Sequence, residues 1–104
     1  MPHSKPKPLS RLVESLTHGN LWLAILSLAS KSPVYAYVLP VLIQKNYSFT
    51  PSRLMIYLVL YKLEAEGLLS SFEQSKRKYY KITARGKKCL ASGKKALLSW
   101  SKKL

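Results

Sequence analysis

The chain has no aspartate and only four glutamates among its 104 residues. Carboxylates for acid–base hydrolysis are therefore scarce, and the sequence contains neither a nucleophile–base pair nor a glycine-rich phosphate loop, so we do not expect an enzyme. A single cysteine, Cys89, excludes an internal disulfide framework. We expect its thiol to be an inert small group in a reducing compartment, with a disulfide across a dimer as the alternative.

Long hydrophobic runs are also missing. The apolar stretches LWLAILSLA and VYAYVLPVLI reach only about half of the roughly 20 residues that a membrane helix needs. The first residues lack the apolar segment of a secretory signal. No set of His, Cys and acidic side chains has the spacing of a zinc site, so neither a metal nor a cofactor is expected. These absences favour a cytoplasmic protein without a membrane partner.

Positive charge, in contrast, is abundant. Eighteen Lys and Arg give a net charge of +14 and a pI of about 10.1, while 47% of the residues are apolar. The apolar content is that of a folded domain, and 104 residues correspond to one domain. The charge indicates a polyanionic partner, most simply nucleic acid.

The stretch from Thr50 to Thr83 carries the clearest pattern. Thr50 is expected to cap a helix with Pro51 in its first position, and Gly67 is expected to end that helix in a left-handed conformation. Apolar side chains recur between them at helical spacing: Ile56, Tyr57, Leu60 and Leu63.

Two short alternating runs follow, at residues 68–73 and 77–83, and residues 74–76 form a polar turn between them. The alternation predicts one face with Leu68, Ser70 and Phe72, and an inner face of the return strand with Tyr80 and Ile82. A helix followed by a hairpin with a cationic tip is typical of a winged helix-turn-helix, the DNA-binding domain predicted for residues 9–83.

Further helices precede this stretch. Residues 1–8 are expected to be a flexible basic arm, which contacts DNA phosphates in the sharper interpretation. A helix over residues 9–16 carries an apolar stripe. Asn20 is expected to cap a buried helix over residues 21–29. A third helix is expected over residues 34–45, where Pro40 either falls in the first turn or kinks the helix.

The C-terminal part, residues 84–104, is predicted to be one helix capped by Thr83. Its apolar and glycine residues follow a heptad seam: Gly86, Leu90, Gly93, Leu97, Trp100 and Leu104. The seam favours a contact between helices of a homodimer, with packing on the chain's own domain as the alternative. The predicted dimer contacts are Leu12, Leu16, Trp22, Leu90, Gly93, Leu97, Trp100 and Leu104.

Three segments together resemble the PadR family of winged-helix transcriptional regulators: LTHGNLWLAILSLASKSPVYAY, YLVLYKLEAEGLL and KRKYYKITARGKKCL. The resemblance covers residues 16–91. It implies a homodimer in which the C-terminal helix packs on the partner's first helix. It also implies sequence-specific DNA binding, commonly repression, in some members relieved by a small hydrophobic effector. Under it, Trp100 becomes a candidate for stacking on such an effector. Ala36 and Pro40 depart from the family pattern.

In a winged helix-turn-helix the helix before the hairpin enters the major groove; here it is the helix between Thr50 and Gly67. The hairpin, called the wing, contacts phosphates or the minor groove. The predicted DNA contacts are Ser52, Arg53, Met55, Tyr57, Lys62, Lys76, Arg77, Lys78, Tyr79 and Lys81, with Lys31 and Lys45 as further backbone contacts. The outer face of the helix is apolar, so we expect weak direct readout of bases. Tyr57 is either a core residue or a phosphate contact.

The predicted fold class is therefore mainly α with a small β-hairpin: a winged helix-turn-helix with N-terminal and C-terminal dimerisation helices. The predicted function is a dimeric transcriptional regulator, a repressor, that binds double-stranded DNA in the nucleoid. An architectural, chromatin-like DNA-binding protein with little sequence specificity is the main alternative. An RNA-binding protein fits the charge, but the aromatic motifs of single-strand binding are missing.

Overall fold

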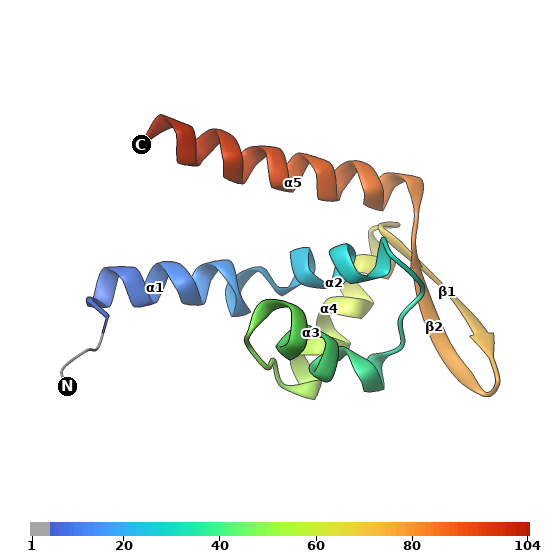
Figure 1. Cartoon of the computed structure of the whole chain (residues 1–104). Coiled ribbons are helices and arrows are strands. Elements are labelled where there is room, and N and C mark those ends of the chain that lie inside the picture. Colours follow the sequence, from blue (N-terminus) through green and yellow to red (C-terminus); the bar gives the residue numbers. More distant parts are fainter. Residues whose placement is uncertain (1–4) are drawn as a thin grey trace.

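The computed structural model describes residues 5–104, and it confirms the predicted mainly helical fold with one hairpin (Figure 1). The elements, in chain order, are α1 (Lys7–Leu16), the 3-10 turn η1 (His18–Asn20), α2 (Leu21–Ala29), η2 (Ala36–Val38), α3 (Leu39–Tyr47), α4 (Arg53–Ala65), β1 (Leu69–Gln74), β2 (Arg77–Ile82) and α5 (Ala84–Lys103). Helices α2, α3 and α4 form the body. The hairpin projects from one end of it, and α1 and α5 extend towards the opposite end.

Helix α1 begins at Lys7, two residues before the predicted start, and has no buried residue. Of the predicted basic arm, residues 1–4 lie outside the described residues, and Lys7 and Pro8 form the first helical turn. Proline suits this position because its missing N–H would have no helical acceptor there. The apolar stripe of α1 is therefore present and faces solvent in the single chain.

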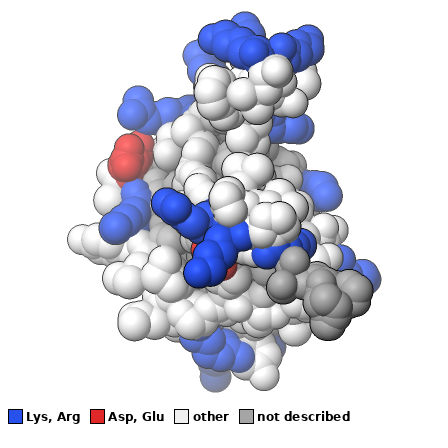
Figure 2. Space-filling model, turned by 90° about the vertical axis from the view of Figure 1, so that its left-hand side faces the viewer, with Lys and Arg blue, Asp and Glu red and all other residues white. Residues whose placement is uncertain are grey.

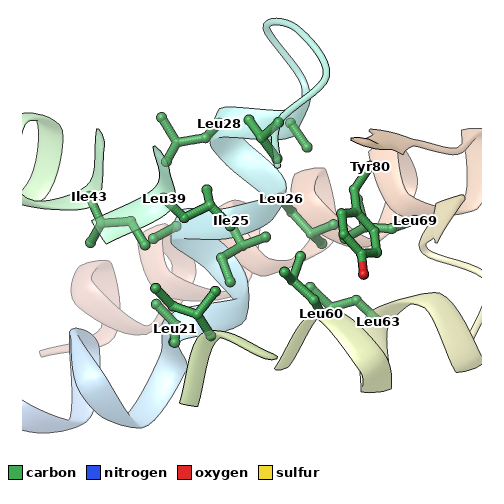
Figure 3. Packing of buried hydrophobic residues seen from close by; sticks show 14 of the residues in the cluster. Leu21, Ile25, Leu26, Leu28, Leu39, Ile43, Leu60, Leu63, Leu69 and Tyr80 are labelled. Atoms are coloured by element: carbon green, nitrogen blue, oxygen red, sulfur yellow. The ribbon is translucent and has the colours of Figure 1, made fainter. Parts of the chain in front are cut away.

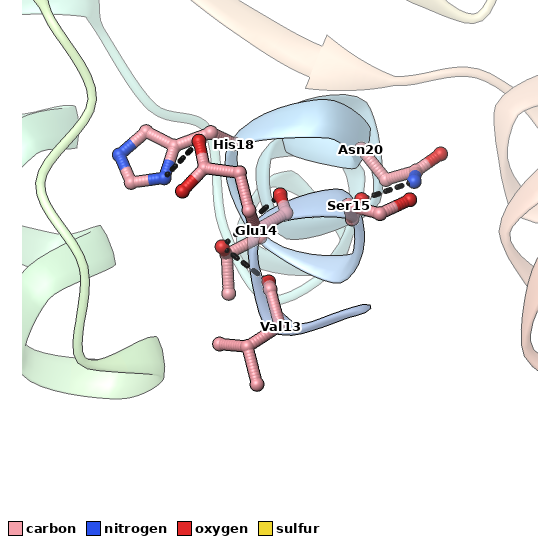
Figure 4. A network of polar contacts seen from close by, with 6 residues as sticks. Val13, Glu14, Ser15, His18 and Asn20 are labelled. Carbon is pink, nitrogen blue, oxygen red and sulfur yellow. Dashed lines mark hydrogen bonds and ion pairs between the residues drawn. The ribbon is translucent and has the colours of Figure 1, made fainter. Parts of the chain in front are cut away.

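The junction between α1 and α2 is held by side chains (Figure 4). Asn20 precedes α2 as predicted, but its side chain makes no capping hydrogen bond. Its amide donates instead to the carbonyl of Ser15, and its oxygen accepts from the indole N–H of Trp22 at 3.2 Å. Glu14 and His18 lie 3.4 Å apart on the exposed side of the same turn. Asn20 therefore connects α1 to α2 instead of capping α2.

Helix α2 is the centre of the hydrophobic core (Figure 3). Its predicted bounds, residues 21–29, are confirmed, and its buried side chains are Leu21, Ala24, Ile25, Leu26, Leu28 and Ala29. A helix that is apolar on most of its circumference is stable only when other elements cover it. Here α3, α4, α5 and β2 do so.

The third helix starts later than predicted. Val34 is not helical: its N–H donates to the carbonyl of Tyr80 at 2.9 Å, and the N–H of Tyr80 donates back at 2.7 Å. The segment thus adds a short third bridge to the hairpin. Helix α3 then begins at Leu39, with Pro40 in its first turn. Of the two predicted alternatives for Pro40, the harmless first-turn position is correct.

The strands differ from the predicted runs by one residue: β1 covers residues 69–74 instead of 68–73, and β2 covers residues 77–82 instead of 77–83. Leu69 pairs with Ile82 and Ser71 pairs with Tyr80, so these four side chains share the core face. Phe72 lies opposite Tyr79 on the other face. Of the predicted face with Leu68, Ser70 and Phe72, the last two lie on the outward face of β1, whereas Leu68 precedes the strand and is buried.

The base of the hairpin is locked to both flanking helices. Gly67 ends α4 at a φ of 75°, as predicted. The hydroxyl of Thr83 donates to the Gly67 carbonyl at 2.6 Å and accepts from the Gly86 N–H at 2.9 Å, which confirms Thr83 as the cap of α5. A Cβ on Gly86 would lie 2.1 Å from the carbonyl oxygen of Leu68. Helix α5 therefore starts in direct backbone contact with the strand that leaves α4.

Candidate nucleic-acid interface

Helices α3 and α4 and the turn between them have the order of a helix-turn-helix. Ser48 ends α3 at a φ of 63°, and the Thr50 hydroxyl donates to the Gln44 side-chain oxygen at 2.6 Å. The cap of α4 is Ser52, not Thr50, since the Met55 N–H donates to its hydroxyl oxygen at 3.2 Å. The predicted cap is thus two residues too early, and Thr50 closes the turn instead. Pro51, correspondingly, is buried before the helix rather than inside it.

Helix α4 buries one stripe and exposes another. The buried side chains are Ile56, Leu60 and Leu63, with Val59 half-buried beside them. Leu54, Tyr57, Leu58 and Tyr61, which we call the outer stripe, are exposed. At 100° per residue their spacing of 3, 1 and 3 puts them on one face, opposite the core. The alternative that packs Tyr57 in the core is therefore wrong.

The cation at the start of α4 has an aromatic partner. The Arg53 guanidinium lies 4.8 Å from the ring centre of Tyr37, in the 3-10 turn η2 before α3. The Arg77 guanidinium of β2 lies at the same distance from the ring of Tyr35. One residue separates the two tyrosines, so residues 35–37 contact both a cation of α4 and a cation of the wing. The sequence does not predict this role for Tyr35 and Tyr37.

The wing is the hairpin of β1 and β2, and a two-residue turn of type I′ forms its tip. Ser75 and Lys76 both have positive φ angles, 54° and 64°, a pair that favours the right-handed strand twist. This turn directs Lys76 into solvent, next to the exposed Arg77. The two predicted tip cations are therefore adjacent and accessible.

The outward face of the hairpin alternates aromatic rings with cations. Tyr79 stacks on Phe72 with 5.6 Å between ring centres and meets the edge of Tyr35 at 5.1 Å. Arg77 lies over Tyr35, and the Lys81 ammonium lies 5.9 Å from the Phe72 ring centre. Each exposed cation–π contact contributes about 0.5–1 kcal/mol. The aromatic rings of this face therefore favour defined positions for the Arg77 and Lys81 side chains.

Lys78 belongs to the opposite face of the hairpin and does not join the tip cluster, in contrast to the prediction. Its ammonium lies 3.6 Å from a Glu64 carboxylate oxygen and 5.3 Å from the Tyr80 ring centre. Tyr80, and then Glu64, hold the pKa of Lys78 above its usual value. The second Glu64 oxygen accepts from the Ser71 hydroxyl at 2.5 Å. Glu64 thus connects α4 to both strands, a role for which the sequence offers no local signal.

Met55 and Lys62 lie on a flank of α4, away from the outer stripe. They line a cavity of about 430 Å³ together with side chains of α2 and α5, among them Trp22 and Cys89. This cavity has the size of a small-molecule site. These two predicted DNA contacts are therefore separated from the other predicted contacts on α4.

The predicted dimer contacts fall into two groups. Trp22, Leu90 and Gly93 are used within the chain: Trp22 and Leu90 pack against the core, and a Cβ on Gly93 would lie 3.0 Å from the Trp22 ring. The other five, on α1 and on the C-terminal half of α5, are exposed: Leu12, Leu16, Leu97, Trp100 and Leu104. The first part of the α5 seam therefore packs on the chain's own domain, and the last part is exposed.

Positive charge is spread over the end of the molecule that lies opposite the wing. Figure 2, which views the end where α1 starts and α5 finishes, shows Lys and Arg side chains around the whole outline and only small acidic areas. Among residues 5–104, no three His, Cys, Asp or Glu side chains gather closely enough to hold a metal ion. In the same part of the chain, no helix has the length and apolar character needed to cross a bilayer.

Residues 25–92 match the family model described as the transcriptional regulator PadR-like family. The fold is similar to that of a PadR-like transcriptional regulator (BC4206) from Bacillus cereus, at 29% identity and a TM-score of 0.76, over 86% of this chain and 91% of that one. A transcriptional regulator from Clostridium thermocellum (Cth-833) gives 25% identity and a TM-score of 0.76, over 85% and 89%.

A PadR family regulator from Clostridium difficile R20291 gives 26% identity and a TM-score of 0.70, over 78% of this chain and 90% of that chain. Among curated proteins, no sequence matches this chain.

Proposed function

Because the chain belongs to the PadR-like family of transcriptional regulators, we propose that it acts as a homodimer that binds double-stranded DNA and represses transcription. The observation that carries DNA contact is the pairing of Arg53 with Tyr37 and of Arg77 with Tyr35. It anchors a cation of the reading helix and a cation of the wing on the same short segment, residues 35–37, which supports contacts of both cations with one duplex. Repression is the sign that the family resemblance implies.

The proposed contacts follow from exposure and partners. Lys76, Arg77 and Lys81 are exposed cations of the wing and are proposed to contact phosphates or the minor groove. Arg53, Ser52 and Tyr57 are proposed to contact the major groove at the start of α4, and Tyr79 to support the wing cations. Lys78 is proposed to act through the wing–helix link with Glu64, and Met55 and Lys62 to make peripheral contacts.

The test is a salt titration of the full chain on two duplexes of equal length, one carrying the region upstream of its own gene and one random. Both are expected to show log K falling steeply with log salt, because counterions are released from phosphates. A regulator should hold the upstream duplex roughly 10³-fold or more tighter at physiological salt. Equal affinities would favour the architectural alternative, and no binding at low salt would refute DNA binding itself.

The proposed dimer is supported by two apolar surfaces that no other part of residues 5–104 covers. Helix α1 has 10 residues and no buried side chain, whereas isolated helices shorter than about 12–15 residues are marginal in water. Its Leu12 is 52% exposed, and Trp100 of α5 is 62% exposed. Both helices extend to the same end of the molecule (Figure 1). We propose that α5 of one protomer covers α1 of the other.

A groove beside these helices supports the same arrangement. It has a volume of about 340 Å³, and its walls come from α1, α2 and α5, including Leu16, Leu23, Leu90 and Leu97. Sedimentation equilibrium tests the dimer directly. We expect a dimer for the natural chain and a monomer for the Leu97→Glu variant. A natural chain that sediments as a monomer at micromolar concentration would refute this part of the proposal.

An effector is the last part of the proposal, and the cavity of about 430 Å³ is its candidate site. Trp22 and Met55 line it, and α4 forms one wall, so a small hydrophobic molecule bound there would shift the reading helix. The test is DNA affinity with and without a panel of small neutral and cationic aromatic compounds. A Trp22→Phe variant should lose any response.

A DNA-binding regulator of this kind would be located with the chromosome in the nucleoid.

A further inference from the structure

The outer stripe of α4 has the wrong chemistry for hydrogen-bonded reading of base edges. Its members are Leu54, Tyr57, Leu58 and Tyr61, with exposures of 68%, 55%, 45% and 72%. Direct readout of guanine and adenine relies on Arg, Lys, Asn and Gln, and the stripe contains none of them. Single exposed apolar side chains are common on protein surfaces, but four large ones on one helical face indicate a binding surface.

The cations nearest to the outer stripe lie around it rather than on it. Arg53 lies over Tyr37 at the start of α4, and Lys78 is paired with Glu64 on the flank towards the wing. Lys62 lies on the opposite flank and lines the cavity between α2, α4 and α5. The surface is therefore an apolar strip with positive charge on either side.

Double-stranded DNA is complementary to this pattern. The major groove has rows of phosphates along both walls, and its floor offers one apolar group, the C5 methyl of thymine. An apolar protein partner would have to accept the flanking cations, and the net charge of +14 disfavours this unless the partner is acidic. We propose that the outer stripe reads thymine methyl groups, so that the protein selects A·T-rich duplexes through their methyls. This inference rests on the proposed function, because it assumes that α4 enters the major groove.

The experiment uses synthetic duplexes that differ only in this methyl group. Affinity of the full chain is measured by fluorescence anisotropy for alternating d(A-T) and d(A-U) duplexes, and for alternating d(G-C) and d(G-5-methyl-C) duplexes. Within each pair, the phosphates and the hydrogen-bonding groups are the same. The two pairs place the same methyl on different base pairs, so a shared preference would follow the methyl rather than the base, and the variants below separate direct contact from an effect of the methyl on duplex shape.

We expect the methylated member to bind more tightly in both pairs. Burial of one methyl is worth roughly a fourfold change in affinity, so a dimer that makes two to four such contacts should discriminate on the order of 10- to 100-fold. Equal affinity for the two members of each pair would overturn the inference while leaving DNA binding intact. No binding to any of the four duplexes at low salt would overturn both this inference and the proposed function.

Variants identify the surface responsible. Leu58→Ala and Tyr61→Ser are expected to bring the affinities of the methylated and unmethylated duplexes together, and both sites are exposed, so folding should persist. Tyr61→Phe should keep the preference, because it removes only the hydroxyl. The matched control is Leu98→Ala, an exposed leucine of α5 outside the seam, which should change nothing. Unchanged discrimination in Leu58→Ala and in Tyr61→Ser would show that the outer stripe is not the reader.

Discussion

Replacing Gly86 with alanine should destabilise the protein, although helix propensity alone predicts the opposite. Gly86 lies in the first turn of α5, and its N–H is bound by the cap residue Thr83. In an ordinary helix position, alanine is favoured over glycine by about 1 kcal/mol. At this position the new Cβ would lie 2.1 Å from the carbonyl oxygen of Leu68 and 2.7 Å from Cγ1 of Ile82.

The magnitude follows from what has to move. Contacts of a Cβ below 3.0 Å are essentially never seen, so α5 would have to shift by about 1 Å relative to the Leu68 backbone. That backbone leads into β1, so it cannot rotate away as a side chain does. Overpacking of this kind costs about 1–3 kcal/mol or more. Because the neighbour is backbone, we take the upper end, about 3 kcal/mol, and subtracting the gain in propensity of about 1 kcal/mol leaves a net loss of about 2 kcal/mol.

Urea unfolding of the natural chain and of Gly86→Ala, at one protein concentration, measures the effect. With a slope of about 2 kcal/mol per molar urea, the midpoint should fall by about 1 M. The matched control is Gly93→Ala in the same helix. Its Cβ would meet Cδ2 of Leu23 at 2.9 Å and the end of the Trp22 ring at 3.0 Å. These side chains can rotate, so we expect a change within about 1 kcal/mol.

A Gly86→Ala variant that is as stable as the natural chain, or more stable, would refute the close approach of α5 to the hairpin. An equal loss for both variants would refute the distinction between a backbone contact and a side-chain contact. A loss confined to Gly86→Ala, with an unchanged slope, would support both. The same variant should also weaken DNA binding, because the base of the wing is displaced together with α5.

Three further variants test the proposed interface. Replacing both Lys76 and Arg77 with alanine should reduce the steepness of log K against log salt by about 1.8 per protomer, measured by anisotropy, and an unchanged slope would remove the wing from the phosphate contacts. Glu64→Gln keeps the shape but loses the charge that faces Lys78, so hydrogen exchange in β1 and β2 should become faster, and unchanged exchange would contradict the link. Trp100→Ala should weaken the dimer at least tenfold in sedimentation equilibrium, and a variant that dimerises as before would exclude Trp100 from the contact.

Capping and breaking signals predicted some element ends correctly, because their cause is local. Gly67 ends α4 and Thr83 starts α5 as predicted, through hydrogen bonds and φ angles within a few residues. The start of α4 was misplaced because Thr50 and Ser52 are both good caps, and only the tertiary contact of Thr50 with Gln44 separates them. Local chemistry therefore allows either residue to cap α4, and the tertiary contact of Thr50 leaves Ser52 as the cap.

Pairing across the chain was not predictable from the same signals. Val34 was expected to be helical, and its bridge to Tyr80 depends on a strand 46 residues away. The hairpin face was ambiguous because Leu68 and Leu69 are both apolar, so alternation can start at either. Both are in fact buried: Leu69 lies on the core face of the hairpin, and the start of α5 covers the Leu68 backbone.

The two stripes of α4 show why the reading face could not be assigned from spacing. Ile56, Leu60 and Leu63 and the members of the outer stripe have the same helical period, so periodicity alone allows either to face the core. The chemistry of the side chains separates them. A buried tyrosine hydroxyl needs a hydrogen-bond partner, and the outer stripe would bury two of them against the aliphatic side chains of α2.

Ile56, Leu60 and Leu63 have no hydroxyl group and can pack against α2 without leaving a polar atom unpaired. They therefore face the core, and the tyrosines face solvent. The same preference that orients α4 therefore leaves the apolar outer stripe exposed, as the proposed contact with the major groove requires.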